Sequence, residues 1–119
     1  MQSTTFFGVA VDCADAAAVA GFWAEVLGRR IADHPTREHA VVLVDDPAVQ
    51  GPRLSFHQVP EPKTVKNRMH LDLIATNFEA ETDRLVALGA RKVRELETST
   101  ARWITFGDIE GNEFDLIAG

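Results

Sequence analysis

The first strong hydrophobic pattern in the chain is a helical one that follows Asp15. Apolar side chains recur there at intervals of three and four residues, at Val19, Phe22, Trp23, Val26 and Leu27. This spacing places them on one face of a helix. Asp15 can accept hydrogen bonds from the free N–H groups of a first helical turn, and Gly28 suits the left-handed end of a helix. The pattern therefore predicts a helix between these two residues.

The same end signals return later in the chain. Asn77 lies 62 residues after Asp15, and Gly89 lies 61 residues after Gly28. These residues predict a second helix over 78–88.

Short runs of β-branched and aromatic residues, separated by turn residues, predict the strands. One run, 5–11, precedes the first helix, and three follow it at 31–34, 40–44 and 53–58. Another run, 69–74, precedes the second helix, and the last three are 92–96, 101–106 and 113–117. A strand, a helix and three strands therefore occur twice, which indicates an internal duplication in an α+β protein.

We expect one domain made of two such modules rather than two independent domains, because the chain has only 119 residues. Module one covers about 4–59 and module two about 68–118. The residues between them, 60–67, contain two prolines and form a linker.

Alternation along the strands separates polar from apolar faces. His70 and Asp72 alternate with leucines, and Ser55, His57 and Asp115 alternate with leucine and phenylalanine. The apolar residues are expected to face the helices, so the polar residues lie on the opposite faces. Two histidines and a carboxylate are the ligand types of Fe(II), Mn, Ni or Zn sites.

The net charge and the cysteine content exclude several classes of partner and site. The formal net charge of −6 is the wrong sign for binding nucleic acid or an anionic membrane surface. The start of the chain shows no basic region before a hydrophobic run, so we expect a cytoplasmic protein. The single cysteine, Cys13, allows no internal disulfide and no zinc site built from paired cysteines.

Several segments resemble the glyoxalase/bleomycin-resistance/dioxygenase superfamily, also called the vicinal oxygen chelate superfamily. They are Gly8-Val9-Ala10-Val11, Phe22-Trp23, Val26-Leu27-Gly28, His70-Leu71-Asp72-Leu73, Trp103-Ile104-Thr105-Phe106 and Asp108-Ile109-Glu110-Gly111-Asn112-Glu113-Phe114-Asp115. The linker Val59-Pro60-Glu61-Pro62-Lys63 with Lys66-Asn67-Arg68 resembles the glyoxalase-like domain group in particular. The resemblance covers nearly the whole chain.

The resemblance implies two tandem βαβββ modules that form a cupped mixed sheet with a central cleft, and usually a homodimer. Some members of this superfamily hold a divalent metal ion that binds two neighbouring substrate oxygens. Other members bind drugs in a cleft without a metal. The ligands lie on the first and last strands of each module. These positions correspond to His70 and Asp115 in module two, where the latter is usually a longer glutamate.

In module one the match is incomplete. The position equivalent to His70 is Gly8, which has no side chain, and the position on the last strand is either Ser55 or His57. We therefore expect the metal ligands to be His70 and Asp115, with His57 as the third.

Further residues are expected at the same cleft. Asp72 is the candidate catalytic residue, as a proton-transfer group or as a partner of a metal ligand. Ser55, His57 and Trp103 are expected to line the ligand cleft, although Trp103 serves equally well as a packing residue.

The incomplete ligand set favours a glyoxalase/bleomycin-resistance-like protein that binds a small organic molecule, with either no cofactor or one divalent metal ion, Zn, Ni, Mn or Fe. The alternative is a metal-dependent lyase, isomerase or dioxygenase of the vicinal oxygen chelate type. Classical glyoxalase I activity is not expected, because nothing identifies a glutathione pocket. A purely structural ferredoxin-like protein would need fewer strands between the helices than we count.

Overall fold

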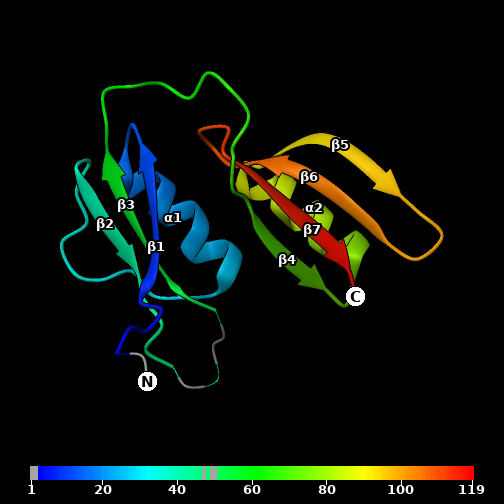
Figure 1. Cartoon of the computed structure of the whole chain (residues 1–119), viewed down its shortest axis with the longest axis horizontal. Coiled ribbons are helices and arrows are strands. Elements are labelled where there is room, and N and C mark those ends of the chain that lie inside the picture. The colour runs from blue at the N-terminus through cyan, green and yellow to red at the C-terminus, as the bar shows by residue number, and fades with distance from the viewer. Residues whose placement is uncertain (1–2, 47, 49–50) are drawn as a thin grey trace. The chain divides into compact units, whose positions relative to one another are not determined.

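The strands form two mixed sheets, one in each half of the chain (Figure 1). The computed structural model describes residues 3–46, 48 and 51–119. The chain divides into two compact units, Met1–Pro62 and Lys63–Gly119, which contain module one and module two. Both units are α+β, as predicted from the two tandem modules.

Module one consists of β1 (Gly8–Cys13), α1 (Ala16–Leu27), β2 (His39–Val42) and β3 (Arg53–Gln58). Its three strands lie in the order β1-β3-β2, with β1 parallel and β2 antiparallel to β3.

Module two consists of β4 (Leu71–Ala75), α2 (Phe78–Leu88), β5 (Arg91–Glu97), β6 (Arg102–Gly107) and β7 (Glu113–Ala118). Its four strands lie in the order β4-β7-β6-β5, with β4 parallel to β7. The first and last strands of each module are therefore neighbours, and this pairing builds the site.

Both predicted helices are confirmed, and their ends have the expected chemistry. The side chain of Asp15 accepts a hydrogen bond from the N–H of Ala18 at 3.2 Å, and Asn77 accepts one from Ala80 at 3.2 Å. Gly28 ends α1 with a φ of 63°, in the left-handed region that favours glycine.

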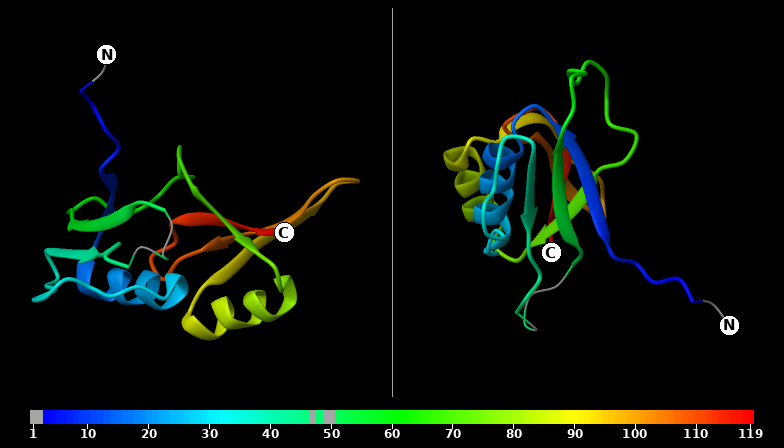
Figure 2. Two further views of the ribbon diagram at one scale, coloured as in Figure 1. Left: turned by 90° about the horizontal axis from the view of Figure 1, so that it is seen from below. Right: turned by 90° about the vertical axis from the view of Figure 1, so that its left-hand side faces the viewer.

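Each helix covers one face of its own sheet. In module one, Trp23 of α1 is buried, as are Leu54 and Phe56 of β3. In module two, Phe106 and Phe114 are fully buried and stack with ring centroids 5.6 Å apart. Figure 2 shows α2 along one side of the sheet of module two. The other face of each sheet, which no helix of its own module covers, is called the open face below.

The strand predicted at 31–34 is wrong. Only Ile31 pairs there, in an isolated bridge to Val42. His34 has a φ of 62°, and this left-handed conformation interrupts an extended backbone. Module one therefore has two full strands after its helix, where three were predicted.

Two apolar residues expected to face the helices do not. Phe7 precedes β1 and is 76% exposed, and Met69 precedes β4 and is 83% exposed. Both strands begin later than predicted, so these residues lie outside the sheets. Neither helix in the described part of the chain has the length and apolarity that a membrane crossing requires.

Candidate functional site

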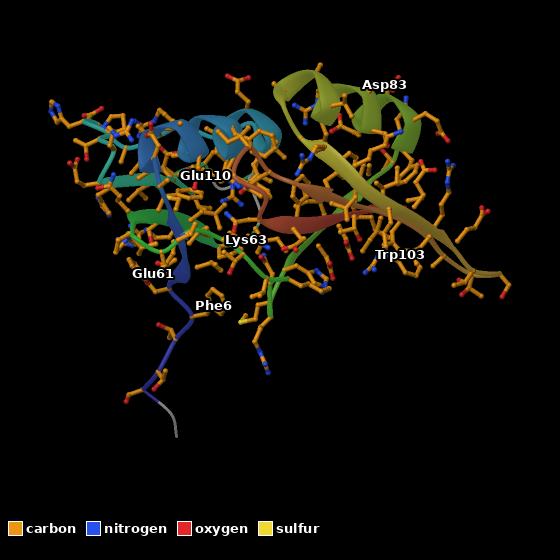
Figure 3. All side chains as sticks on the ribbon, turned by 90° about the horizontal axis from the view of Figure 1, so that it is seen from above. Phe6, Glu61, Lys63, Asp83, Trp103 and Glu110 are labelled. Carbon is orange, nitrogen blue, oxygen red and sulfur yellow. The ribbon has the colours of Figure 1, made fainter. Side chains whose placement is uncertain are left out.

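The open face of module two carries a row of polar side chains beside a row of apolar ones. The strand register aligns Asp72 of β4, Asp115 of β7 and Thr105 of β6, which form the polar row. Two residues after Asp72 and Asp115, and two residues before Thr105 on the antiparallel strand β6, the register aligns the residues of the apolar row, Ile74, Ile117 and Trp103. Figure 3 shows Trp103 and the α2 residue Asp83 on opposite sides of this sheet. The polar row therefore lies on the face away from α2.

His70 completes a cluster with the two carboxylates of the polar row. Its Nδ1 atom lies 3.0 Å from Oδ1 of Asp72 and 3.9 Å from Oδ2 of Asp115. Each of the three residues offers a ligand atom, and these atoms lie within 4.8 Å of one another. The structure thus brings the two predicted metal ligands, His70 and Asp115, together with the candidate catalytic residue Asp72.

The donor atoms of this cluster fit a divalent cation. Ions with bonds of 2.0–2.2 Å place neighbouring ligand atoms roughly 3.0–3.5 Å apart. The separation of 3.0 Å between His70 and Asp72 lies in this range, and the separation of 3.9 Å between His70 and Asp115 is wider. Imidazole nitrogen and carboxylate oxygen together suit Zn, Mn, Fe(II) and Ni. Asp72 offers a third donor atom beside His70 and Asp115, whereas Gly8 of module one has no side chain.

Thr105 holds Asp115 in place. Its hydroxyl donates a hydrogen bond of 2.6 Å to Oδ1 of Asp115, which leaves Oδ2 on the side of His70. Thr105 is buried, and its hydrogen bond to Asp115 is partly buried. Sequence reasoning missed this residue, although the alternation of Trp103, Ile104 and Thr105 places it on the polar face.

The registers in the two modules decide which residue of module one is equivalent to Asp115. Ala10 lies 62 residues before Asp72, the offset that separates the helix caps. Asp72 pairs with Asp115, and Ala10 pairs with Ser55. Ser55 is therefore the equivalent of Asp115, and His57 is equivalent to Ile117 in the apolar row.

Ser55 and His57 contact each other within module one. Oγ of Ser55 lies 3.1 Å from Nε2 of His57. A residue that the sequence analysis did not single out, His39, packs against His57 with ring centroids 4.9 Å apart. That His57 is a ligand alongside His70 and Asp115 stays a prediction.

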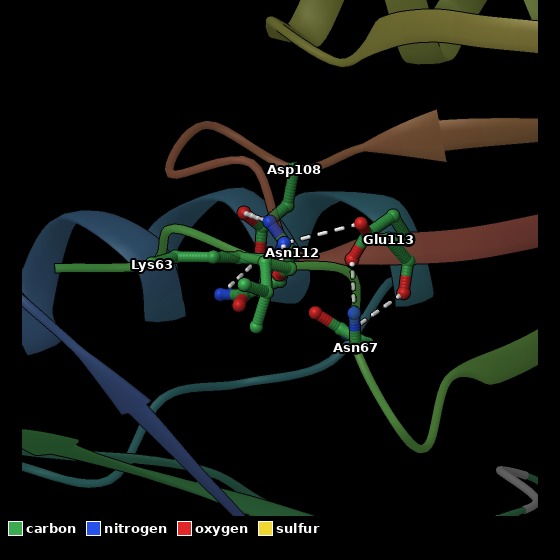
Figure 4. Close-up of polar contacts among 6 residues, drawn as sticks. Lys63, Asn67, Asp108, Asn112 and Glu113 are labelled. Carbon is green, nitrogen blue, oxygen red and sulfur yellow. Dashed lines mark hydrogen bonds and ion pairs between the residues drawn. The ribbon is translucent and has the colours of Figure 1, made fainter.

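The segment that leads to His70 is fixed to the start of β7 through Glu113 (Figure 4). The Lys63 ammonium lies 3.1 Å from Oε1 of Glu113, and the backbone N–H of Asn67 donates to Oε2 at 3.1 Å. Burial raises the pKa of Glu113, but the hydrogen bonds from Lys63 and Asn67 outweigh this effect and lower its pKa below the usual value. Glu113 is therefore an ionised anchor beside the cluster.

Solved structures share this fold at low sequence identity. A variant of the fosfomycin resistance protein FosX from Listeria monocytogenes, in complex with Mn(II) and dihydroxypropylphosphonic acid, is 17% identical, with a TM-score of 0.77 over 100% of this chain and 92% of its own. Lactoylglutathione lyase from Agrobacterium tumefaciens is 12% identical, with a TM-score of 0.66 over 99% of this chain and 96% of its own. Hypothetical protein SA1046 from S. aureus is 14% identical, with a TM-score of 0.72 over 100% and 95%.

Among curated proteins, no sequence matches this chain. The family model described as "Glyoxalase-like domain" matches residues 8–117, from the first residue of β1 to within one residue of the end of β7. The duplicated topology, the pairing of first and last strands and this match agree: the chain belongs to the glyoxalase-like domain family, within the vicinal oxygen chelate superfamily.

Proposed function

We propose that this protein binds a small organic molecule through oxygen atoms, at a divalent cation held by His70, Asp72 and Asp115 on the open face of module two. The observation that carries the proposal is the convergence of three ligand atoms within 4.8 Å. Because Asp72 joins the two expected ligands, the incomplete set at Gly8 no longer favours metal-free binding. The FosX structure with Mn(II) and a small phosphonic acid supports the same chemistry.

The residues of the cluster have separate tasks in this proposal. Asp115 is the most enclosed ligand, with a side chain 15% exposed, and Thr105 fixes its orientation. Asp72 is 56% exposed and is free to follow the ligand. When bound, a divalent cation polarises the oxygen atoms of the ligand as a Lewis acid.

The apolar row defines the rest of the ligand. Rows two residues apart along a strand are separated by about 6.5 Å, which is the scale of a small organic molecule. A ligand whose oxygen atoms reach the polar row therefore places its carbon skeleton against Ile74, Ile117 and Trp103. We infer that Trp103 serves as a ligand wall.

Catalysis by a metal-dependent lyase, isomerase or dioxygenase is the second candidate function. In this function Asp72 acts as the proton acceptor rather than as the third ligand, because an exposed carboxylate beside His70 can accept a proton from a bound ligand. Relatives of this fold include a lactoylglutathione lyase and the oxidase ChaP-H2.

Metal content measured by plasma mass spectrometry tests the proposal. We expect untagged parent protein to bind near-stoichiometric Mn, Fe(II), Ni or Zn at the cluster, and H70A and D115N to lose that ion. D83N is the matched control, because Asp83 is an exposed aspartate on α2. Parent protein without metal, and without thermal stabilisation by any of the four ions, would contradict the proposal.

The same samples decide two finer points. Small-molecule binding that survives EDTA would indicate a metal-free binding protein. Turnover of a bound small molecule that the D72N substitution abolishes would indicate a metal-dependent enzyme.

The family resemblance also leads us to infer a cytoplasmic homodimer. For a homodimer, light scattering on the parent protein would give twice the mass of one chain.

A further inference from the structure

Two of the four histidines in the chain face each other in module one. The register pairs His39 of β2 directly with His57 of β3. Their ring centroids lie 4.9 Å apart with planes inclined by 48°. The cluster in module two uses His70, and the remaining histidine is His34.

The inner ring of this pair is held in a fixed orientation. His57 lies on the central strand, and its Nε2 atom is 3.1 Å from Oγ of the buried Ser55. When Nε2–H donates to that oxygen, Nδ1 keeps its lone pair. Metal-binding histidines commonly use one nitrogen for the ion and the other for such an orienting hydrogen bond.

A carboxylate lies in register on the other side of His57. Asp12 of β1 is the partner of His57 across the parallel pair, so one row of the sheet reads Asp12, His57, His39. Asp12 is exposed, and its charge favours a cation near the pair. In module two the equivalent row is the apolar one, so the polar chemistry of the two modules lies in different rows.

We propose that His39 and His57 form a second divalent-metal site, within module one and separate from the His70 cluster. Two imidazoles favour ions that prefer nitrogen ligands, such as Cu(II), Ni(II) and Zn(II). The carboxylate-rich cluster of module two also takes Mn(II). An ion at the pair would hold the short edge strand β2 against β3. This proposal is independent of the proposed function.

Nuclear magnetic resonance of the four imidazoles in full-length protein measures metal binding at each of the two sites separately. Substoichiometric Cu(II) is the probe, because it broadens the resonances of nearby rings. We expect His39 and His57 to broaden together, both in the parent and in H70A, while His34 stays sharp.

Variants supply the second measurement, with Ni(II) affinity followed by calorimetry in the H70A background. Each of the variants H39A, H39Q and H57A removes one imidazole of the pair. We expect each to weaken Ni(II) binding by about a hundredfold, because the second ligand of a chelate binds intramolecularly. H34A should change the affinity by less than about twofold. Backbone spectra identify any variant that fails to fold, and H39Q is the conservative change at an exposed position.

Three results would overturn the proposal. Equal broadening of all four rings would indicate histidines that bind copper independently. Broadening of His57 together with His70, without His39, would place His57 in the site of module two. An unchanged Ni(II) affinity in both H39A and H39Q would remove His39 from any site.

Discussion

At the scale of single residues, the orientation of Asp115 depends on one hydroxyl group. The bond from Thr105 is 2.6 Å long and connects neighbouring strands on the open face. An aspartate is shorter than the glutamate that the resemblance implies at this position. It has one fewer rotatable bond, so a single hydrogen bond is sufficient to fix its orientation. Removing this hydroxyl would leave Oδ1 of Asp115 without the hydrogen bond from Thr105.

Replacing Thr105 by valine tests this dependence, because valine has the same shape without the hydroxyl. We expect T105V to weaken metal binding at the cluster by about tenfold or more, and to lower the free energy of unfolding by about 1 kcal/mol. T105S keeps the hydroxyl and should restore the affinity. Parent-like metal affinity in T105V, measured by calorimetry, would refute the role of this bond.

At the scale of elements, the segment before β4 is fixed by contacts to the start of β7. Lys63 and Asn67 both reach Glu113, so the chain enters β4 at a defined position. His70 is only three residues beyond Asn67. The position of His70 relative to Asp115 therefore depends on an ionised glutamate.

The lowered pKa of Glu113 predicts a specific pH dependence. The stabilisation is complete above the unfolded pKa, about 4.3, and is lost as the pH falls through the folded pKa. E113Q should therefore be less stable than the parent at pH 7, by about 1–2 kcal/mol, and the difference should shrink below about pH 4. Chemical denaturation of E113Q and of the parent at pH 7 and at pH 3 measures this stability difference.

E61Q is the control for this experiment, since Glu61 is an exposed glutamate in the connecting segment. It removes the same charge and should change stability by less than about 0.5 kcal/mol. An equal stability difference between E113Q and the parent at pH 7 and pH 3 would contradict an ionised anchor.

At the scale of the whole molecule, the two modules share one arrangement of strands and helix, with one full strand fewer in module one, and they differ in their cores and open faces. Phe56 is fully buried in module one, and Phe114 is fully buried in module two. The chain divides into compact units at Pro62 and Lys63. Each core is therefore expected to stabilise its own module more than the other module.

Truncating one core residue per module tests this division. F56A and F114A should each cost about 3–5 kcal/mol. In hydrogen exchange, F56A should reduce protection mainly in β1 to β3, and F114A mainly in β4 to β7. Each variant is the control for the other. A uniform loss of protection over the whole chain in both variants would show one cooperative core instead.

Local patterns in the sequence were sufficient for both helices and for every predicted strand except the one at 31–34. Both helices, their capping residues and the duplication follow from spacing and from residues such as Asp15 and Gly28, because these signals act within a few residues. The alternation in β4 likewise predicted that His70 and Asp72 lie on one face. The prediction failed at 31–34, where pairing is limited to Ile31 and the chain leaves the extended conformation at His34, whose left-handed backbone no periodicity reveals.

The composition of the site was decided by tertiary structure. Asp72 and Asp115 are 43 residues apart in the chain, and they meet because β4 pairs with β7 in one register. The pairing of β6 with β7 brings Thr105 to Asp115, and the pairing of β2 with β3 brings His39 to His57. A shift of one residue would turn each of these side chains to the other face. The sequence by itself therefore determined the elements and their polar faces, and strand pairing decided which polar residues became neighbours.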